Sequence, residues 1–177
     1  MGIFGGPCKH LVSYDGENWD FAGLTGPDKL NIKIGELKGN RQVLQTAADI
    51  TQLYDAMQFS NCTRINQLPK DSPDRVKLAY ESMQGEQQLV QLALLIKLLQ
   101  AQPNSDKLQQ AIAEWIAAQS KRLSTLPAAP PKVAPLREAK VTVSSVRLSI
   151  KKAADSDPHL KQALASKTSF DLSRYLT

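Results

Sequence analysis

Apolar residues recur every three or four positions through three long stretches of the chain, a spacing that predicts three helices. The stretches cover residues 40–67, 72–101 and 106–123, and Val43 and Ala47 begin the apolar stripe of the first. Because only short segments separate the stretches, the helices are expected to pack antiparallel around a shared core.

The second stretch contains the most apolar run of the chain, Leu89 to Leu99. A helix that is apolar on nearly all sides must be covered by other elements. Ser72 and Pro73 suit the N-cap and the first helical position. This helix is therefore predicted to be the central element of the core.

A small β element is predicted ahead of the helices. Residues 10–14 and 19–22 are typical of two short strands, with a turn at Asp15-Gly16 between them. Residues 30–34 alternate apolar and polar side chains and predict another strand. Strands this short are marginal alone, so they are expected to pack on the helices. The fold class is mainly α (α+β).

Four prolines between Ser124 and Leu136 favour extended chain and mark a linker. The expected organisation is a small β element at 1–36, a three-helix core at 37–123, a Pro/Ala linker at 124–136 and a C-terminal arm at 137–177. The part before the linker is expected to fold without the arm.

Within the arm, residues 141–150 alternate with a slip of one residue at Ser144-Ser145, which favours a bulged strand. A helix that uses Val143, Val146 and Ile150 is the alternative. A short helix is predicted to begin at Asp157-Pro158 and to end near residue 165.

Charge is divided unevenly along the chain. Residues 1–120 hold 11 Lys and Arg against 13 Asp and Glu, whereas residues 121–177 hold 11 against 4. The basic part is therefore the C-terminal third, which suits either a solvated basic surface or contact with an acidic partner such as nucleic acid.

The chain has two cysteines, Cys8 and Cys62, too few for a disulfide framework in a chain of this size. A reducing compartment follows, and Cys62 is expected to be a small core residue. The start of the chain lacks the basic and apolar parts of a secretory signal. The most apolar run is too short to span a bilayer. These observations predict a cytoplasmic protein without a membrane span.

The sequence offers little chemistry. Cys8 and His10 have a spacing that zinc ligands use, but a closed zinc site needs four ligands. The acidic turn that holds Asp15, Glu17 and Asp20 does not match a calcium loop. No motif of an activated nucleophile or of a phosphate-binding loop accompanies them. Neither an enzyme nor a bound metal or cofactor is therefore expected.

The leading functional hypothesis is a non-catalytic helical interaction or assembly module. Its arm is expected to dock on a protein partner or on a neighbouring copy, because the arm is too apolar to prefer solvent. The expected partner-binding residues are Phe170, Leu172, Tyr175 and Leu176.

Sequence-independent nucleic-acid binding is the alternative, and an enzyme built from dispersed residues is the third hypothesis. Lysines and arginines of the arm would then contact phosphates, and Tyr175 or Phe170 would stack on bases. The expected contact residues are Arg137, Lys140, Arg147, Lys151, Lys152, Lys161, Lys167 and Arg174.

Overall fold

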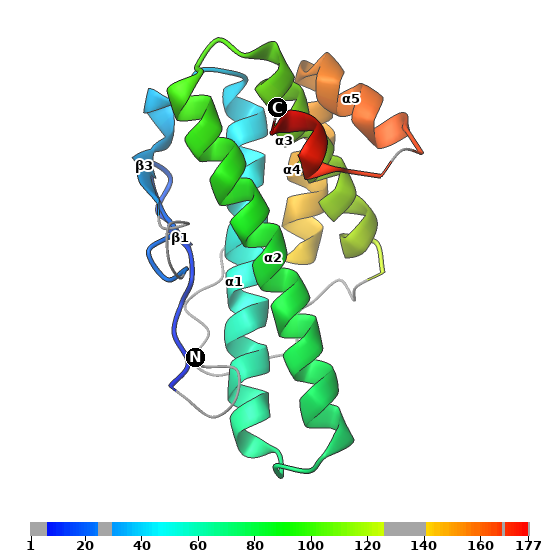
Figure 1. Cartoon of the computed structure of the whole chain (residues 1–177). Coiled ribbons are helices and arrows are strands. Elements are labelled where there is room, and N and C mark those ends of the chain that lie inside the picture. The colour runs from blue at the N-terminus through cyan, green and yellow to red at the C-terminus, as the bar shows by residue number, and fades with distance from the viewer. Residues whose placement is uncertain (1–6, 25–29, 126–140, 168, 177) are drawn as a thin grey trace.

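The computed structural model describes residues 7–24, 30–125, 141–167 and 169–176 (Figure 1). In these ranges the protein is mainly helical with a small antiparallel sheet, as the sequence predicts. The strands are β1 (Ser13–Tyr14), β2 (Asn18–Asp20) and β3 (Asn31–Lys33); the α-helices are α1 (Arg41–Gln67), α2 (Pro73–Ala101), α3 (Asp106–Leu123), α4 (Val143–Ser156) and α5 (Pro158–Ala165); and the 3-10 helices are η3 (Ile34–Glu36) and η4 (Leu172–Tyr175).

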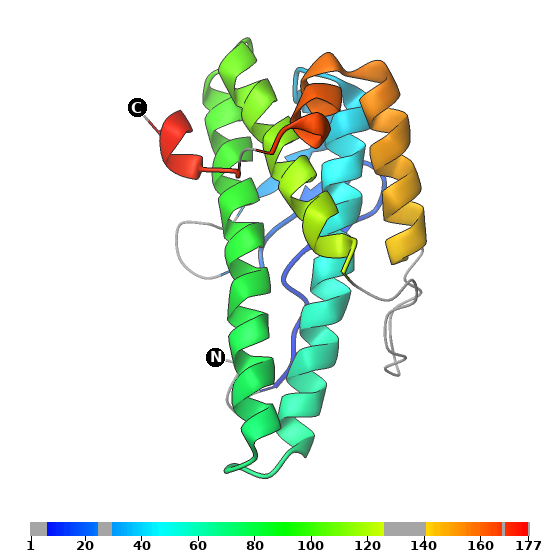
Figure 2. The same ribbon diagram turned by 90° about the vertical axis from the view of Figure 1, so that its right-hand side faces the viewer.

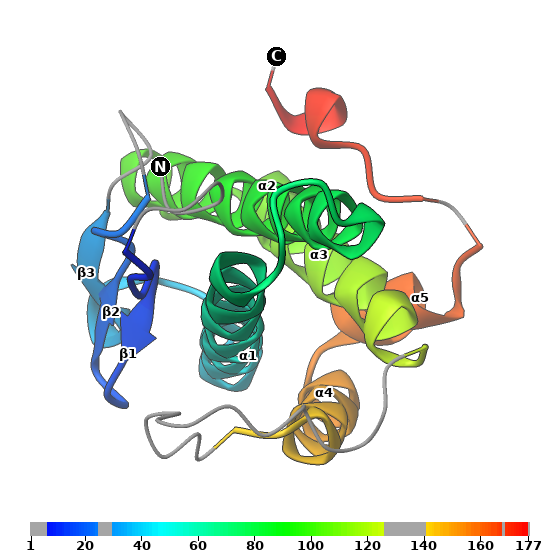
Figure 3. The same cartoon turned by 90° about the horizontal axis from the view of Figure 1, so that it is seen from below.

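The central helix is α1, not α2. Seen from below, the sheet covers one side of α1, α2 and α3 another, and α4 a third (Figure 3). The prediction that α2 is central is therefore wrong. Its C-terminal half is buried, as Leu92, Leu95 and Leu99 show, but Val76 and Tyr80 in its N-terminal half are exposed.

Local signals place the ends of the first three helices close to the predicted positions. The side chains of Asn40 and Ser105 cap α1 and α3 by accepting hydrogen bonds from the N–H groups of Val43 and Leu108, both at 3.2 Å. Ser72 occupies the N-cap position of α2, but its side chain makes no capping hydrogen bond. These caps satisfy backbone donors that a helix cannot pair internally.

The sheet has the order β1-β2-β3 and packs on α1 through Trp19. Trp19 pairs with Ile32 of β3, and its indole nitrogen donates to Thr51 of α1 at 3.1 Å. Gly23 lies so near the preceding chain that a Cβ there would be 2.3 Å from the carbonyl oxygen of His10. The strands are thus held by α1, as expected for strands too short to be stable alone.

A disulfide joins Cys8 to Cys62, with the Cα atoms 5.7 Å apart. Nearby on α1, Asp55 accepts hydrogen bonds from the backbone N–H groups of Leu11 and Val12, at 2.6 and 3.3 Å. The N-terminal segment therefore lies along α1. The expectation that Cys62 is only a small core residue is wrong. Although two cysteines are too few for a framework of several disulfides, this packing brings Cys8 and Cys62 together across 54 residues of sequence.

Residues 143–156 form a helix, so the bulged strand predicted at 141–150 is wrong and the helical alternative is correct. Thr142 and Ser145 form a capping box, in which each side chain accepts a hydrogen bond from the other residue's backbone N–H. The serines that resemble a bulge in the sequence therefore lie in the first turn of a helix. Val146 and Ile150 on one face of that helix are buried.

The C-terminal region is not a separate arm in this structure. Helix α4 packs on α1, and α5 packs on α3. Val146, Leu160 and Tyr175 belong to the same apolar cluster as Trp19 and Leu95. The apolar faces of α4 and α5 thus join the three predicted core helices in one apolar cluster. Most of the predicted linker lies outside the described residues.

Candidate functional site

The C-terminal residues predicted to bind a partner lie mostly against their own chain. Phe170 and Leu172 are partly buried against the core, and Tyr175 is 9% exposed. The rings of Phe170 and Tyr175 stack with their centroids 6.4 Å apart. Leu176 is 52% exposed. Docking of these residues on a partner stays a prediction, and in this structure three of them contribute to intramolecular packing.

The basic residues proposed to contact nucleic acid are spread over α4, α5 and the segment after α5. Arg147 donates to the carbonyl oxygen of Leu123 at 2.6 Å, and Arg174 donates to that of Ser169 at 3.3 Å. Arg137 and Lys140 lie outside the described residues. The remaining basic residues of this set are exposed: Lys151, Lys152, Lys161 and Lys167.

An exposed apolar stripe on α2 is a feature that the sequence analysis missed. Val76, Tyr80 and Met83, 69%, 62% and 47% exposed, follow one another at steps of four and three residues and so lie on one face of the helix. We call these three residues the α2 stripe. The same alternation of four and three residues recurs on the buried face of α2, for example from Leu78 to Ser82 and from Ser82 to Gly85. The sequence of α2 thus carries two apolar stripes on different faces of the helix, one buried and one exposed.

A chain of hydrogen bonds crosses the core from α1 through α3 to α2. The hydroxyl of Tyr54 donates to Oε1 of Gln119 at 2.5 Å, and Nε2 of Gln119 donates to Oε1 of Gln88 at 2.8 Å. The indole nitrogen of Trp115 donates to the carbonyl oxygen of Gln88 at 3.1 Å. Gln119 is fully buried. Because a buried amide needs partners, this chain of bonds favours one arrangement of the three helices.

Burial raises the pKa of Tyr54 to about 12, and the guanidinium group of Arg122, 5.9 Å from the centre of the ring, opposes that rise. The neutral phenol is therefore the form that the core favours. This form also supplies the proton that Gln119 accepts.

We expect the stability of the protein to fall as the pH rises from about 10 toward 12. Tyrosine in an unfolded chain ionises near pH 10, whereas Tyr54 keeps its proton to about 12, so its stabilising contribution is complete below pH 10 and is lost above it. The loss should be about 2–3 kcal/mol, measured by urea unfolding at increasing pH.

Tyr54→Phe is the matched variant for this measurement. The variant should lose this pH dependence, but at neutral pH it should be less stable by about 1–3 kcal/mol, because Gln119 then lacks a donor. If both proteins lose the same stability at high pH, the loss does not come from ionisation of Tyr54.

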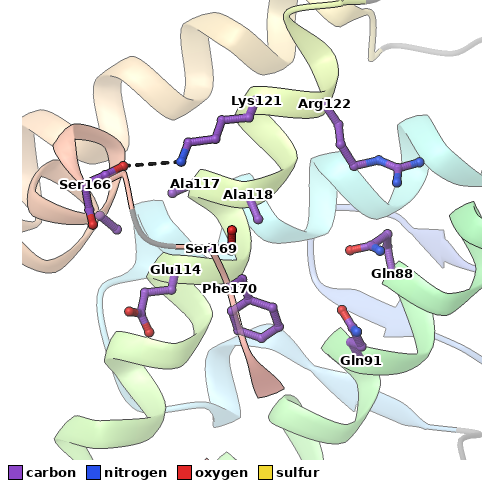
Figure 4. A pocket seen from close by; sticks show the side chains of 11 residues that line it. Gln88, Gln91, Glu114, Ala117, Ala118, Lys121, Arg122, Ser166, Ser169 and Phe170 are labelled. Atoms are coloured by element: carbon purple, nitrogen blue, oxygen red, sulfur yellow. Dashed lines mark hydrogen bonds between the residues drawn. The ribbon is translucent and has the colours of Figure 1, made fainter. Parts of the chain in front are cut away.

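A pocket of about 320 Å³ adjoins this chain of hydrogen bonds. Its walls are α2, α3, the end of α5 and the segment after α5 (Figure 4). Gln88 belongs to both features, because its side chain lines the pocket and accepts from Gln119. Sequence analysis did not find this pocket, since its residues come from three separate parts of the chain.

His10, two residues after Cys8, packs against side chains of α1. Its Nδ1 atom is 2.6 Å from a carboxylate oxygen of Asp55, and its ring stacks on Phe59 with centroids 4.5 Å apart. The disulfide leaves neither Cys8 nor Cys62 as the thiolate that zinc binding or nucleophilic attack requires. Among the described residues, no group of three or more His, Cys, Asp or Glu side chains is placed to hold a metal ion.

Comparison with protein-family models, with curated proteins and with solved structures finds no match for this chain. Within the part of the chain that the structure describes, no helix has both the length and the apolar character needed to cross a bilayer.

Proposed function

We propose that this chain is a non-catalytic interaction module that pairs with a second copy through the α2 stripe. The observation that carries the proposal is the exposure of Val76, Tyr80 and Met83 on one helix face. Single exposed apolar residues are ordinary, but these three form a continuous line along a helix. Contact with another apolar surface would remove that line from water.

The spacing and position of the stripe favour a helix as the occupant. Steps of four and three residues are those by which two helices pack side by side. The N-terminal half of α2 lies in the end of the α1–α2 hairpin that extends past α3, α4 and α5 (Figures 1 and 2). A partner helix would therefore reach the stripe without displacing another helix of the core.

A second copy is the occupant that fits this face most simply. In an antiparallel pair related by a two-fold axis, the same patch is used twice. With the axis between Tyr80 and Met83, the ring of each Tyr80 would lie against the Met83 side chain of the other copy, a favourable contact of sulfur with an aromatic ring. Lys77 and Gln84 lie seven residues apart along the same edge of the stripe, so in the antiparallel pair Lys77 would lie near Gln84 of the other copy. The pairing therefore brings no like charges together at this edge.

Tyr80→Glu tests this proposal. The wild-type protein is expected to form dimers with a dissociation constant below about 1 mM, measured by sedimentation equilibrium. Each change counts twice in a symmetric dimer, so losing about 1.5 kcal/mol of apolar burial per site weakens pairing by roughly 100-fold. Leu148→Glu is the matched control, because Leu148 is 54% exposed but lies on α4. That variant should dimerise normally.

A monomeric wild-type protein, or equal weakening by both substitutions, would refute the pairing. Binding to single-stranded nucleic acid at physiological salt, abolished by replacing Lys151 and Lys152 with alanine, would favour the nucleic-acid alternative instead. Such binding should weaken with salt by a logarithmic slope of about −0.7 per phosphate contacted, whereas apolar pairing should barely respond.

The expected cytoplasmic location stays a prediction, and the Cys8–Cys62 disulfide weighs against it. Disulfides persist in oxidising compartments and are rare in reducing ones. We therefore propose that the module works in an oxidising environment. Treating cells with a thiol-alkylating agent before lysis tests this, because the agent modifies only free thiols. Alkylated Cys8 and Cys62 in the native protein would contradict the proposal.

A further inference from the structure

The end of the α1–α2 hairpin that extends past the other helices has a small apolar core of its own (Figures 1 and 2). We call this end, residues 61–81, the hairpin tip. Ile65 of α1 and Leu78 and Ala79 of α2 form an apolar cluster there that is separate from the main cluster. Most of the α2 stripe also lies on the tip. The direction of the pairing surface therefore depends on how the tip is joined to the main core.

Polar and small residues separate the tip from the main core. The Nε2 atom of Gln58 in α1 donates to the carbonyl oxygen of Ser82 in α2. A Cβ atom at Gly85 would lie only 2.7 Å from the same Nε2 atom. The hydroxyl oxygen of Ser82 is buried and has no hydrogen-bond partner among the described residues, which is unfavourable. We call Gln58, Ser82 and Gly85 the polar joint.

Both helices carry local features that allow bending near the polar joint. The hydroxyl of Thr63 donates to the carbonyl oxygen of Phe59 at 3.0 Å, a bond that often bends a helix. Ser60 and Asn61, between these two residues, have low helix propensity. Glycine inside a helix, as at Gly85, lowers the resistance to bending. The polar joint therefore has the composition of a hinge.

The N-terminal segment crosses the polar joint on another face of α1, and it runs toward the free end of the hairpin (Figure 1). Residues 8–12, which we call the strap, contact Asp55, Phe59, Cys62 and Asn66. These four residues follow one another at steps of four, three and four and span about 16 Å of the helix. Asp55 lies on the main-core side of the joint, whereas Cys62 and Asn66 lie on the tip.

The two ends of the strap are held by different kinds of bond. On the main-core side, Asp55 accepts from the backbone N–H groups of Leu11 and Val12. On the tip, the strap is attached covalently by the disulfide, and the side-chain amide of Asn66 adds a long hydrogen bond of 3.4 Å to Sγ of Cys8. Cleavage of the disulfide would therefore release the strap from the tip and leave its other end in place.

We propose that the Cys8–Cys62 disulfide locks a hinge at the polar joint, so that reduction frees the hairpin tip and weakens pairing of two copies. This inference rests on the proposed pairing through the α2 stripe. With the disulfide intact, the strap fixes the direction of the tip, and the stripe is held ready to pair. After reduction, the tip changes direction by hinge motion, and pairing must first order it, which lowers the affinity.

The reductant in this proposal is a dithiol. One of its thiolates attacks a sulfur of the disulfide and forms a mixed disulfide, which its second thiolate then breaks. Two electrons and two protons pass to Cys8 and Cys62, which become thiols, and the reductant leaves as a disulfide. Both cysteines are partly exposed, so a reductant reaches them. The lock is closed in the oxidising environment proposed above and opens where the chain meets such a dithiol.

NMR relaxation dispersion of the backbone amides tests the hinge, because hinge motions occur in microseconds to milliseconds. The measurement uses Tyr80→Glu, the variant expected to be monomeric, with and without dithiothreitol, so that association adds no exchange. On reduction, the exchange contribution to transverse relaxation should rise at least about twofold at residues 62–67 and 73–81 and stay unchanged at residues 89–99. No rise, or an equal rise in all three segments, would overturn the hinge.

Replacing Cys8 and Cys62 with alanine in the same Tyr80→Glu background supplies the matched control. This variant should show the relaxation of the reduced protein both with and without dithiothreitol. If dithiothreitol changes its relaxation, the disulfide is not the lock, and the proposal is wrong.

Sedimentation equilibrium of the wild-type protein tests the control of pairing. Reduction should raise the dissociation constant of the dimer at least about tenfold. An unchanged dissociation constant would overturn the control of pairing. If the oxidised protein does not dimerise, the pairing proposal fails and its redox control with it, whereas the relaxation measurement on the monomer still decides whether the disulfide locks the hinge.

Discussion

Replacing both Cys8 and Cys62 with alanine is expected to lower the free energy of unfolding by about 4 kcal/mol. The disulfide closes a loop between residues 54 positions apart, and a loop of this length strongly restricts the unfolded chain. The contacts of Asp55 with Leu11 and Val12 should remain and keep the segment beside α1. Urea unfolding of the oxidised wild-type protein and of the double variant measures the difference.

Dithiothreitol provides the control for this prediction. It should bring the stability of the wild-type protein down to that of the double variant and should leave the variant unchanged. If the double variant loses less than about 1 kcal/mol, the hydrogen bonds to Asp55, and not the disulfide, hold the N-terminal segment.

Leu95→Ala is expected to destabilise the protein by about 2–5 kcal/mol. Leu95 is fully buried in the main apolar cluster, so the substitution removes buried methyl groups and leaves a cavity. Chemical denaturation measures the loss. The stability change in Leu148→Ala, at an exposed position on α4, should stay within about 0.5 kcal/mol.

A loss below about 1 kcal/mol in Leu95→Ala would mean that the core relaxes around this site, contrary to its complete burial. It would also argue that α2 contributes less to the core than its apolar run indicates. The unfolding transition of both variants should stay cooperative, since the apolar cluster joins all five α-helices and the sheet.

Local signals accounted for most helix boundaries. Asn40 and Ser105 cap their helices with side-chain hydrogen bonds, and Pro73 begins α2. Interactions between residues three or four positions apart decide such features, so a single sequence contains them. The error at residues 141–150 was also local, because Ser145 suits both a bulge and a capping box.

The identity of the central helix was harder to predict. The buried face of α1 includes polar residues such as Thr46, Thr51 and Gln58. Thr46 and Thr51 donate to carbonyl oxygens of their own helix, which makes burial of their hydroxyls inexpensive. A count of apolar residues therefore underestimates how deeply α1 lies and favours α2.

The candidate sites could not be predicted from the sequence, because they depend on how distant parts of the chain pack together. The pocket joins Gln88, Glu114 and Phe170, which are far apart in the chain and belong to no local motif. The α2 stripe has a local pattern, but only the packing of the other helices shows that this face is uncovered.

The sequence by itself determined the mainly helical class, the small β element and the ends of the first three helices, because turn residues, caps and apolar periodicity act over a few positions. The tertiary structure alone decided which helix is central, that α4 and α5 complete the core, that Cys8 meets Cys62, and where apolar surface and the pocket remain. These features depend on contacts between residues far apart in the chain, where the same apolar pattern is compatible with several arrangements of the helices.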